Sequence, residues 1–490
     1  MEAPSMTTDG DPAIDRPPTA PAPAREPLGR SYRLLWTASG LSNLADGVAK
    51  LALPLAAAQL TRSPAAVAGV MLALTLPWLL FALPVGVFVD RLDRRRLMLG
   101  ANLLRGALLA LLVPAVALGV DSIWALYAVA LGLGTAETVY DTAAQSILPR
   151  VVRRDQLSRA NGRLYAVELS ANEFVGPPLS GFLVAAGVIA AFAAPGVLWL
   201  VAVVVLWPMR GSFRAGTTGP GAGAEPTPEP GRAADGRRTV GKRRLATVGT
   251  EIAEGLRFVW GNRLLRTFAM MTGGFNLATS AVMAIIVLFA VGPGSPMGLS
   301  EPAFGVLLAT MAGGSVVGSF LVEGMERRFG RVVLIFGSVL TGALMVGTPA
   351  LTTNPFLIGA AFVLGGVGVV ASNVVMVSLR QRITPDRLLG RVNSAYRLVA
   401  WGTRPLGALL GGLVAEVWGL RAVFAVTAVV MLSLLTGMTV VRGRAMEDAE
   451  REAAEREKIE ATGVPTGDAP TPAGPPPAGT SSPGVTGNGP

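Results

Sequence analysis

Twelve long apolar segments constrain the fold of this chain more than any other feature of its sequence. A helix that crosses a lipid bilayer needs about 20 mostly apolar residues, and each segment meets that requirement. We therefore predict an all-α membrane protein of twelve transmembrane helices, arranged as two pseudo-symmetric halves of six. The first six segments span 34–60, 65–89, 97–119, 123–146, 164–186 and 188–208, and the second six span 267–291, 303–324, 331–351, 355–378, 394–417 and 420–441.

The composition supports a membrane protein and excludes several kinds of active site. The chain is 51% hydrophobic and only 15% charged, whereas a soluble protein has about 25% charged residues. It contains no Cys and no His, which excludes disulfides, thiolate or imidazole metal ligands and cysteine nucleophiles. We expect no catalytic residues, no metal and no cofactor, and the chain is not predicted to be an enzyme. Any proton transfer must then use Asp and Glu.

Arginines on alternate loops set the predicted orientation. Loops rich in Lys and Arg stay in the cytoplasm, so both termini and the central linker are predicted to face the cytoplasm, in a multi-pass protein of the bacterial cytoplasmic (inner) membrane. This topology accounts for the net charge of +10 without a nucleic-acid partner. The basic loops carry Arg91, Arg94, Arg95 and Arg96, then Arg150, Arg153, Arg154 and Arg159, then Arg327, Arg328 and Arg331, and finally Arg380, Arg382, Arg387 and Arg391, whereas the alternate loops hold only Arg62 and Arg421.

Composition also predicts the segments outside the spans. The central linker is rich in Gly, Pro and Ala, which is typical of a flexible chain. The segment after it places Ile252, Leu256, Val259 and Trp260 on one helical face, which is typical of an interfacial helix. The predicted organisation is a disordered N-terminal tail at 1–30, a six-helix bundle at 31–209, a flexible cytoplasmic linker at 210–250, an amphipathic interfacial helix at 251–263, a second six-helix bundle at 264–442, and a charged helix with a disordered tail at 443–490.

Two loops and two spans resemble each other across the halves. Leu148–Gly162 and Leu379–Asn393 each combine Leu, a basic run, Asp and Leu at matching spacing, about 230 residues apart. Gly176–Leu183 (GPPLSGFL) is echoed by Arg404–Gly412 (RPLGALLGG). Duplicated halves with a substrate site between them at mid-membrane are typical of secondary transporters.

The loop between the second and third spans carries a longer motif. It reads Gly86-Val-Phe-Val-Asp90-Arg91-Leu-Asp93-Arg94-Arg95. This resembles the Gly-x-x-x-Asp-Arg-x-Gly-Arg-Arg/Lys motif of the major facilitator superfamily, with Asp93 where Gly is usual. The resemblance implies a monomeric transporter embedded in lipid, whose motif closes the cytoplasmic side. A basic loop that only fixes topology is the alternative. The residues of this expected cytoplasmic gate are Gly86, Asp90, Arg91, Arg94 and Arg95.

Within that superfamily the chain resembles the enterobactin-exporter-like and macrolide-efflux-like branch. This resemblance rests on Asn43 and Asp46 in the first span, on Arg105 in the third span, on the two repeated loops and on the Arg404–Gly412 run. It implies export of a drug or a siderophore, driven by the proton gradient.

Ionisable side chains inside the spans are the candidate functional residues, because each costs about 2.5 kcal/mol or more at the centre of a membrane helix. Asp46 and Lys50 lie four residues apart in one span. Arg105 in the third span and Glu137 in the fourth span lie at similar depth in the membrane. Each pair is expected either to be structural or to carry a proton, and Arg404 to bind an anionic cargo group or a first-half carboxylate. The predicted proton and substrate path comprises Asp46, Lys50, Arg105, Glu137, Asp141, Glu168, Glu173 and Arg404.

The fifth span partly matches the Gly-Pro-x-x-Gly-Gly motif of antiporter-type exporters. The matching residues are Gly176, Pro177 and Gly181, with Asn172 and Ser180 in place of two glycines. Glycines permit close helix packing and proline permits bending. The motif favours export, and helix packing alone is the other interpretation.

Together these features predict a secondary active transporter that exports a small hydrophobic or amphipathic molecule in exchange for protons by alternating access. A drug, macrolide, siderophore or metabolite is the expected cargo. The alternatives are a proton-coupled importer of a small nutrient, which the fifth-span motif disfavours, and a non-transporting receptor or scaffold, which the intramembrane charges disfavour. The absence of His and Cys disfavours a membrane-embedded enzyme. The absence of a Gly-x-x-x-x-Gly-Lys-Ser/Thr loop disfavours an ATP-driven pump.

Overall fold

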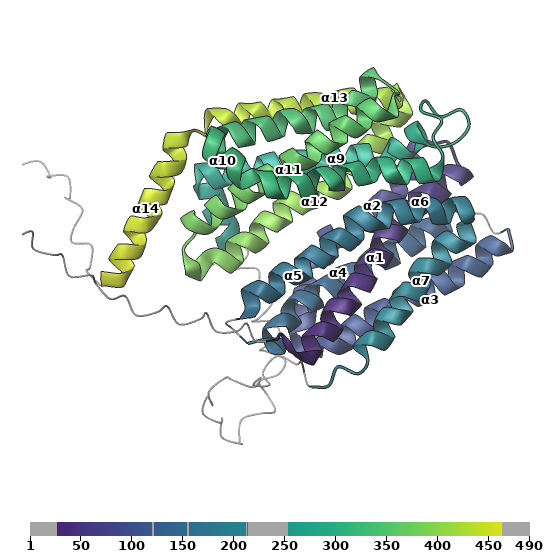
Figure 1. Cartoon of the computed structure of the whole chain (residues 1–490), viewed down its shortest axis with the longest axis horizontal. Coiled ribbons are helices and arrows are strands. Elements are labelled where there is room, and N and C mark those ends of the chain that lie inside the picture. The colour runs from purple at the N-terminus through teal and green to yellow at the C-terminus, as the bar shows by residue number, and fades with distance from the viewer. Residues whose placement is uncertain (1–26, 120–121, 154–155, 212, 214–252, 463–490) are drawn as a thin grey trace, which may run out of the picture.

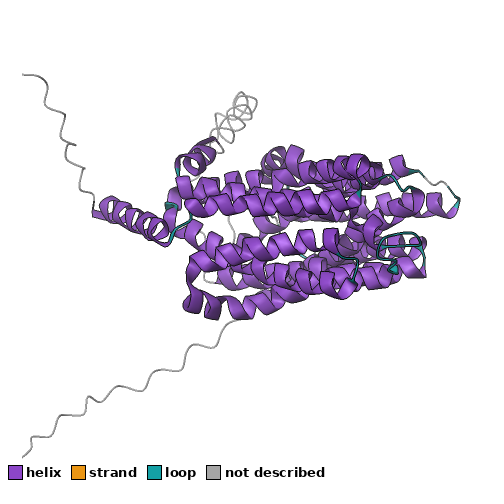
Figure 2. Ribbon diagram, turned by 90° about the horizontal axis from the view of Figure 1, so that it is seen from above, coloured by secondary structure: helices purple, strands orange, loops and turns teal. Residues whose placement is uncertain are grey.

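The computed structural model describes residues 27–119, 122–153, 156–211, 213 and 253–462. Nearly all of this part of the chain is helical (Figure 2), and its only β-pairing is an isolated bridge between Val291 and Leu299. The predicted tails beyond these ranges, and nearly all of the predicted linker, lie outside the described residues.

The first half of the chain forms one group of helices, the lower one in Figure 1. We call it the N-terminal layer. Two of its helices, α5 (Leu157–Leu169) and α6 (Gly176–Ala186), are joined by a π-helical turn, Ser170–Val175, so that residues 157–186 form one continuous helical segment. The helices are α1 (Gly29–Leu60), α2 (Pro64–Arg91), α3 (Arg94–Ala117), α4 (Ile123–Val151), α5 (Leu157–Leu169), α6 (Gly176–Ala186) and α7 (Val188–Leu206).

The second half forms the C-terminal layer, the upper group in Figure 1. A charged helix, α14 (Gly443–Thr462), follows it and projects from one end. The helices are α9 (Arg263–Ala290), α10 (Glu301–Leu351), α11 (Pro355–Ile383), α12 (Asp386–Trp418), α13 (Leu420–Ser433), which continues as the 3-10 turn Leu434–Thr439, and α14 (Gly443–Thr462).

Gly330 divides α10 into two helices. Its φ of 78° and ψ of 162° are not helical, and glycine adopts this backbone conformation at little cost. The break lies between the predicted spans 303–324 and 331–351, so α10 contains both of them.

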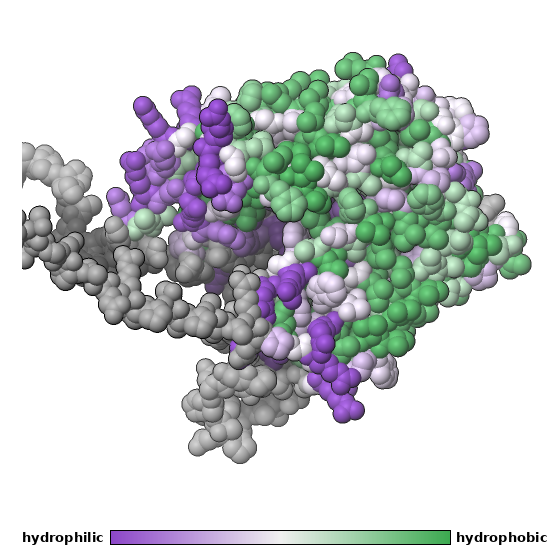
Figure 3. Space-filling model, viewed as in Figure 1, coloured by the Kyte–Doolittle hydropathy of each residue, from purple (hydrophilic) through white to green (hydrophobic). Residues whose placement is uncertain are grey.

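The helices have the length and surface of membrane spans. Among the described residues, nine helices are long and apolar enough to cross a bilayer, counting Glu301–Leu351 as one. Large apolar side chains are exposed on the outside, including Phe320 at 82%, Leu351 at 88% and Phe356 at 85%. Figure 3 shows hydrophobic residues over most of the visible face, with hydrophilic side chains gathered at the end that carries α14. Lipid is the solvent that suits such a surface.

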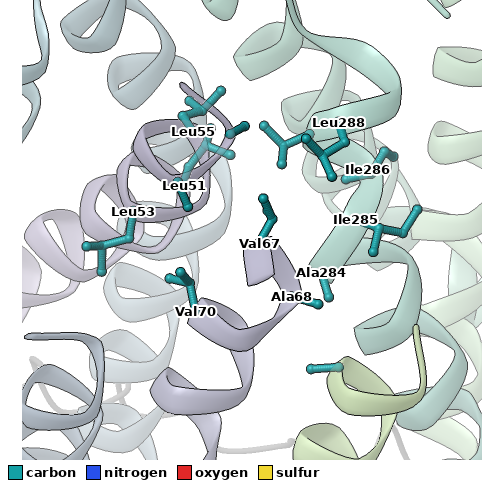
Figure 4. Packing of buried hydrophobic residues seen from close by; sticks show 14 of the residues in the cluster. Leu51, Leu53, Leu55, Val67, Ala68, Val70, Ala284, Ile285, Ile286 and Leu288 are labelled. Atoms are coloured by element: carbon teal, nitrogen blue, oxygen red, sulfur yellow. The ribbon is translucent and has the colours of Figure 1, made fainter. Parts of the chain in front are cut away.

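The two layers share a core at one end of the molecule only. One hydrophobic cluster contains Leu55 of α1 and Val67 of α2 together with Leu288 of α9, and all three point into the same space between the layers (Figure 4). The other two clusters are each confined to one layer, Leu28–Phe213 in one and Val259–Met446 in the other. The shared core lies at the end with few arginines, which we call the arginine-poor end. The separate cores lie at the opposite, arginine-rich end, where Figure 3 shows a recess between the layers.

Glycines allow the layers to meet closely at the arginine-poor end. A Cβ added at Gly181 of α6 would lie 3.0 Å from the Cα of Pro302 in α10, and one added at Gly305 would lie 2.6 Å from the Pro177 carbonyl oxygen. A Cβ at Gly412 of α12 would lie 2.6 Å from the Cβ of Ala68 in α2. Small residues bring helix backbones into van der Waals contact, which is the main attraction between helices in lipid.

The segment predicted as an interfacial helix is helical at 253–261. Val259 is fully buried in the C-terminal layer, while Trp260 is 43% exposed. Glu254 forms an ion pair with Arg391 at the start of α12. The segment is therefore attached to the C-terminal layer on one face.

α14 is held to the C-terminal layer by ion pairs that are partly exposed. Glu450 accepts hydrogen bonds from Arg331 at 2.8 Å and from Arg382 at 3.4 Å. The Glu450→Gln variant is expected to lose less than about 1 kcal/mol of stability, because solvent screens such pairs. Thermal unfolding of the purified protein measures this, and a loss of several kcal/mol would contradict it.

Candidate functional site

Polar side chains of α1 form one stripe that faces the interior of the N-terminal layer. Ser42, Asn43 and Asp46 are 0%, 6% and 5% exposed, and Lys50 lies one turn further along. Residues three and four positions apart share a helix face, which brings these groups together. Buried polar groups in a membrane helix must find partners on neighbouring helices.

Arg105 of α3 is the centre of the first contact network. It is fully buried, and its Nη1 donates to Ser42 Oγ at 3.0 Å and to Asp46 Oδ2 at 3.4 Å. Its guanidinium carbon also lies 5.3 Å and 5.5 Å from the ring centroids of Tyr140 and Trp199. A buried guanidinium is stabilised by an anion and by aromatic faces, and this site supplies both.

Lys50 forms the second network. Its Nζ donates to Glu137 Oε1 of α4 at 2.8 Å and to Asn172 Oδ1 at 3.5 Å. The Asn172 amide in turn donates to Asn43 Oδ1 at 3.4 Å. The Lys50 side chain is 35% exposed and that of Glu137 is 13% exposed. A lysine exposed at this depth of a span borders the space between the layers rather than lipid.

The partners differ from those that the sequence suggested. Asp46 pairs with Arg105 rather than with Lys50, and Lys50 pairs with Glu137, which the sequence had suggested for Arg105. The four groups still form one cluster, because α1 places Asp46 towards α3 and Lys50 towards α4. Ser42, Tyr140 and Trp199 were not expected in the site. No feature of the sequence identifies Trp199 as a site residue. Ser42 could have been identified, because it lies one turn before Asp46 on the same helix face.

The remaining predicted acids lie outside these two ion pairs. Asp141 is half-buried one turn after Glu137 on α4, Glu168 is half-buried at the end of α5, and Glu173 is exposed on the π-helical turn. Asp141 and Glu168 extend the acidic side of the N-terminal layer towards the arginine-rich end, whereas Glu173 adjoins Asn172 at the level of Lys50.

The C-terminal layer presents arginines and tryptophans from α12. Arg404 is exposed, and its guanidinium lies 5.0 Å from the ring centroid of Trp401. Arg397, two turns earlier, lies 4.9 Å from the same ring and donates to Gln145 Oε1 of α4 at 3.2 Å. Trp401 packs edge-on against Trp78 of α2, with centroids 5.0 Å apart. Arg397 was not predicted, although its seven-residue spacing from Arg404 places both on one helix face.

Charge is divided between the layers. The acidic residues of the second half at 263–442 are Glu301, Glu323, Glu326, Asp386 and Glu416, all near helix ends or the Gly330 break. Mid-span acids therefore come from the N-terminal layer, which pairs two of them with its own Arg105 and Lys50, while the C-terminal layer adds Arg397 and Arg404 from α12. Arg404 interacts electrostatically with both Glu137 and Glu173.

Part of the expected gate motif lies at the end of α2. The side chains of Gly86, Asp90 and Arg91 lie outside the described residues. Arg94 donates to the Phe213 carbonyl oxygen at 3.2 Å, and Arg95 donates to the carbonyl oxygen of Trp207. These two arginines therefore contact the chain that follows α7.

Asp93, which replaces the usual glycine, has two hydrogen-bonding roles. It caps α3 by accepting from the Arg96 N–H at 3.0 Å, and it accepts from the Phe213 N–H at 2.9 Å. A side chain that satisfies a first-turn N–H stabilises a helix start. Asp is thus suited to this position of the loop.

The motif of the fifth span lies where α1 meets the π-helical turn. A Cβ added at Gly176 would lie 2.7 Å from the Cα of Gly47 in α1, so these glycines permit backbone contact. Gly181 lies further along and contacts α10 of the other layer. Gly176 thus packs within one layer, whereas Gly181 packs between the layers.

A family model described as a transmembrane secretion effector matches residues 19–218 and 235–464, which is most of the chain. The chain belongs to the major facilitator superfamily. It is similar to the multidrug efflux pump Tap of Mycolicibacterium fortuitum, with 30% identity over 82% of this chain and 93% of that protein. Tap of Mycobacterium tuberculosis is 28% identical over 86% and 95%. The enterobactin exporter EntS of Citrobacter koseri is 26% identical over 78% and 85%.

Solved structures show the major facilitator fold. The nucleoside transporter NupG superposes with a TM-score of 0.63 at 13% identity, over 84% of this chain and 99% of that one. A bacterial homologue of the iron transporter ferroportin in an inward-facing state gives 0.62 at 15%, over 84% and 98%. As a major facilitator protein, the chain is a multi-pass membrane transporter of small molecules and not an enzyme.

Proposed function

We propose that this major facilitator protein exports a small amphipathic molecule in exchange for protons, by alternating access through twelve spans. The observation that carries the proposal is the pair of intramembrane ion pairs in the N-terminal layer, Asp46 with Arg105 and Lys50 with Glu137. Relatives named as a multidrug efflux pump and an enterobactin exporter support the direction.

The arginine-rich end is assigned to the cytoplasm, because basic loops remain on that side of the membrane. Both termini then face the cytoplasm of a bacterium, and the protein lies in the inner membrane as a monomer. The layers share a core at the opposite end only, so this conformation is open to the cytoplasm. Cargo would reach the site from the cytoplasm or from the inner leaflet.

Protons would act on the buried carboxylates. Asp46 forms an ion pair with Arg105, and Glu137 forms one with Lys50. A proton on Asp46 leaves the buried Arg105 without its partner, which costs free energy unless the helices move. A proton on Glu137 releases the partly exposed Lys50. Proton binding and a change of conformation are therefore linked. One proton moving down about 100 mV supplies about 2.3 kcal/mol, which concentrates cargo on the outer side.

The walls of the space suit an amphipathic cargo. Glu173 provides a carboxylate on the N-terminal side, while Arg404 provides a guanidinium on the C-terminal side. Trp78 and Trp401 add aromatic surface beside Arg404. Ligand sites commonly combine apolar and aromatic walls with a few polar groups. When the arginine-rich end closes, the opposed charges come together and neutralise one another.

Dye efflux from cells tests the proposal. Expression of the protein is expected to accelerate efflux of at least one dye in a panel of cationic, neutral and anionic fluorophores. A protonophore is expected to abolish the gain, because the proton gradient supplies the energy. Faster dye uptake would instead support an importer, and efflux that survives the protonophore would contradict proton coupling. Cells that produce the Asp46→Asn variant at equal membrane abundance are the control.

A further inference from the structure

Glu416, at the end of α12, makes hydrogen bonds across the two layers at the arginine-poor end. Its Oε2 accepts from Ser63 Oγ at 2.8 Å and from the Ala65 N–H at 3.1 Å. Ser63 and Ala65 belong to the start of α2 in the other layer.

These contacts complete the N-terminal cap of α2. Ser63 Oγ accepts from the Ala66 N–H at 3.3 Å while donating to Glu416. The Ala65 N–H lies in the first turn of α2, where an N–H has no acceptor within its own helix. A carboxylate beside such N–H groups also interacts favourably with the positive end of the helix dipole. The cap of one layer is therefore supplied in part by the other.

The part of the cap that Glu416 supplies exists only while the layers are in contact. Gly412 lies one turn before Glu416 on α12, and a Cβ there would lie 2.6 Å from the Cβ of Ala68 and 3.2 Å from the Cα of Ala65. Val67, which lies between Ala65 and Ala68 in α2, is fully buried in the core that the layers share. Separation of α2 from α12 would break both Glu416 hydrogen bonds at once.

We propose that Glu416 is a positioning residue of the transport cycle, which holds the outer side closed by capping α2 and must release it before cargo can leave. The inference rests on the alternating access proposed above. Loss of the cap raises the population that is open at the arginine-poor end by about fivefold, the factor that corresponds to a typical helix cap. Cargo presented from the cytoplasm then binds with lower apparent affinity, because fewer molecules are in the state that accepts it.

The chain contains no cysteine, so a single introduced thiol reports on opening. Val67→Cys is placed in the full chain in right-side-out membranes and treated with a membrane-impermeant maleimide, with and without Glu416→Ala. The alanine variant is expected to label about fivefold faster. Glu416→Gln, which keeps an acceptor oxygen but loses the charge, is expected to fall between. Pro296→Cys, exposed at the same end, is expected to label equally in all backgrounds.

A variant of Ser63, the hydrogen-bond partner of Glu416, distinguishes loss of the cap from a general loss of stability. Ser63→Ala is expected to raise labelling of Val67→Cys by less than Glu416→Ala does, because Glu416 keeps its hydrogen bond from the Ala65 N–H. The double variant is expected to label about as fast as Glu416→Ala alone, because the Ser63–Glu416 bond is lost in both single variants. Equal labelling rates with and without Glu416 would overturn the inference, and so would fully additive effects. Faster labelling in a protein that moves none of the tested dyes would support the cap and count only against the proposed export activity.

Discussion

The Asp46→Asn variant is expected to lose cargo transport and to be less stable than the wild type. Arg105 is fully buried, and Asp46 is the carboxylate paired with it. Removing one member of a buried ion pair costs about 3–5 kcal/mol, because the remaining charge is left uncompensated. The asparagine also cannot take up and release a proton. Thermal unfolding in detergent and dye efflux at equal abundance in the membrane measure the two effects.

A double variant separates the structural role of this pair from proton transfer. Asp46→Asn combined with Arg105→Gln removes both charges and is expected to recover most of the lost stability, since neutral replacements of a buried pair are often tolerated. Efflux is expected to remain at background. Recovery of both stability and efflux would show that the pair is only structural.

The Gly47→Ala variant is expected to lose stability and transport together. A Cβ at this position would lie 2.5 Å from the carbonyl oxygen and 2.9 Å from the Cα of Asn172, and both atoms belong to the backbone of the π-helical turn. Backbone cannot rotate away as a side chain does, so α1 must move. Overpacking of this kind costs about 1–3 kcal/mol, and it displaces the Asn172 side chain that contacts Lys50.

Gly100→Ala is the matched control on α3. No heavy atom lies within 4 Å of a Cβ added there, and alanine is about 1 kcal/mol more favourable than glycine inside a helix. This variant is expected to be as stable as the wild type or slightly more stable, with normal efflux. Equal stability of the Gly47→Ala and Gly100→Ala variants would contradict the close contact between α1 and the π-helical turn.

Much of the helical architecture was predictable because apolar length is a direct signal for a spanning helix. The break at Gly330 agrees with the separate spans predicted on either side of it. The π-helical turn at Ser170–Val175 was not predicted, because a wider turn leaves no mark in apolar periodicity. That turn sets the direction of Asn172 and Glu173, so their surroundings could not be derived from the sequence.

The charged residues of the site could be selected from the sequence, but their pairing could not. Charge inside an apolar segment identified Asp46, Lys50, Arg105 and Glu137 without knowledge of the fold. Pairing depends on the rotation of each helix about its axis, and four-residue spacing placed Asp46 beside Lys50 although α3 provides a partner with better geometry. Arg397 could have been predicted as a site residue, because its seven-residue spacing from Arg404 places both on one helix face.

Coupled transport in proteoliposomes measures whether cargo is exchanged for protons at Asp46. Purified protein is reconstituted into vesicles with an acidic interior that contains a trapped pH indicator, and a dye exported by cells is then added outside. Dye is expected to accumulate inside the vesicles while the interior pH rises, and the Asp46→Asn variant is expected to show neither change. Dye accumulation without a pH change, or unchanged coupling in the variant, would contradict proton exchange at Asp46.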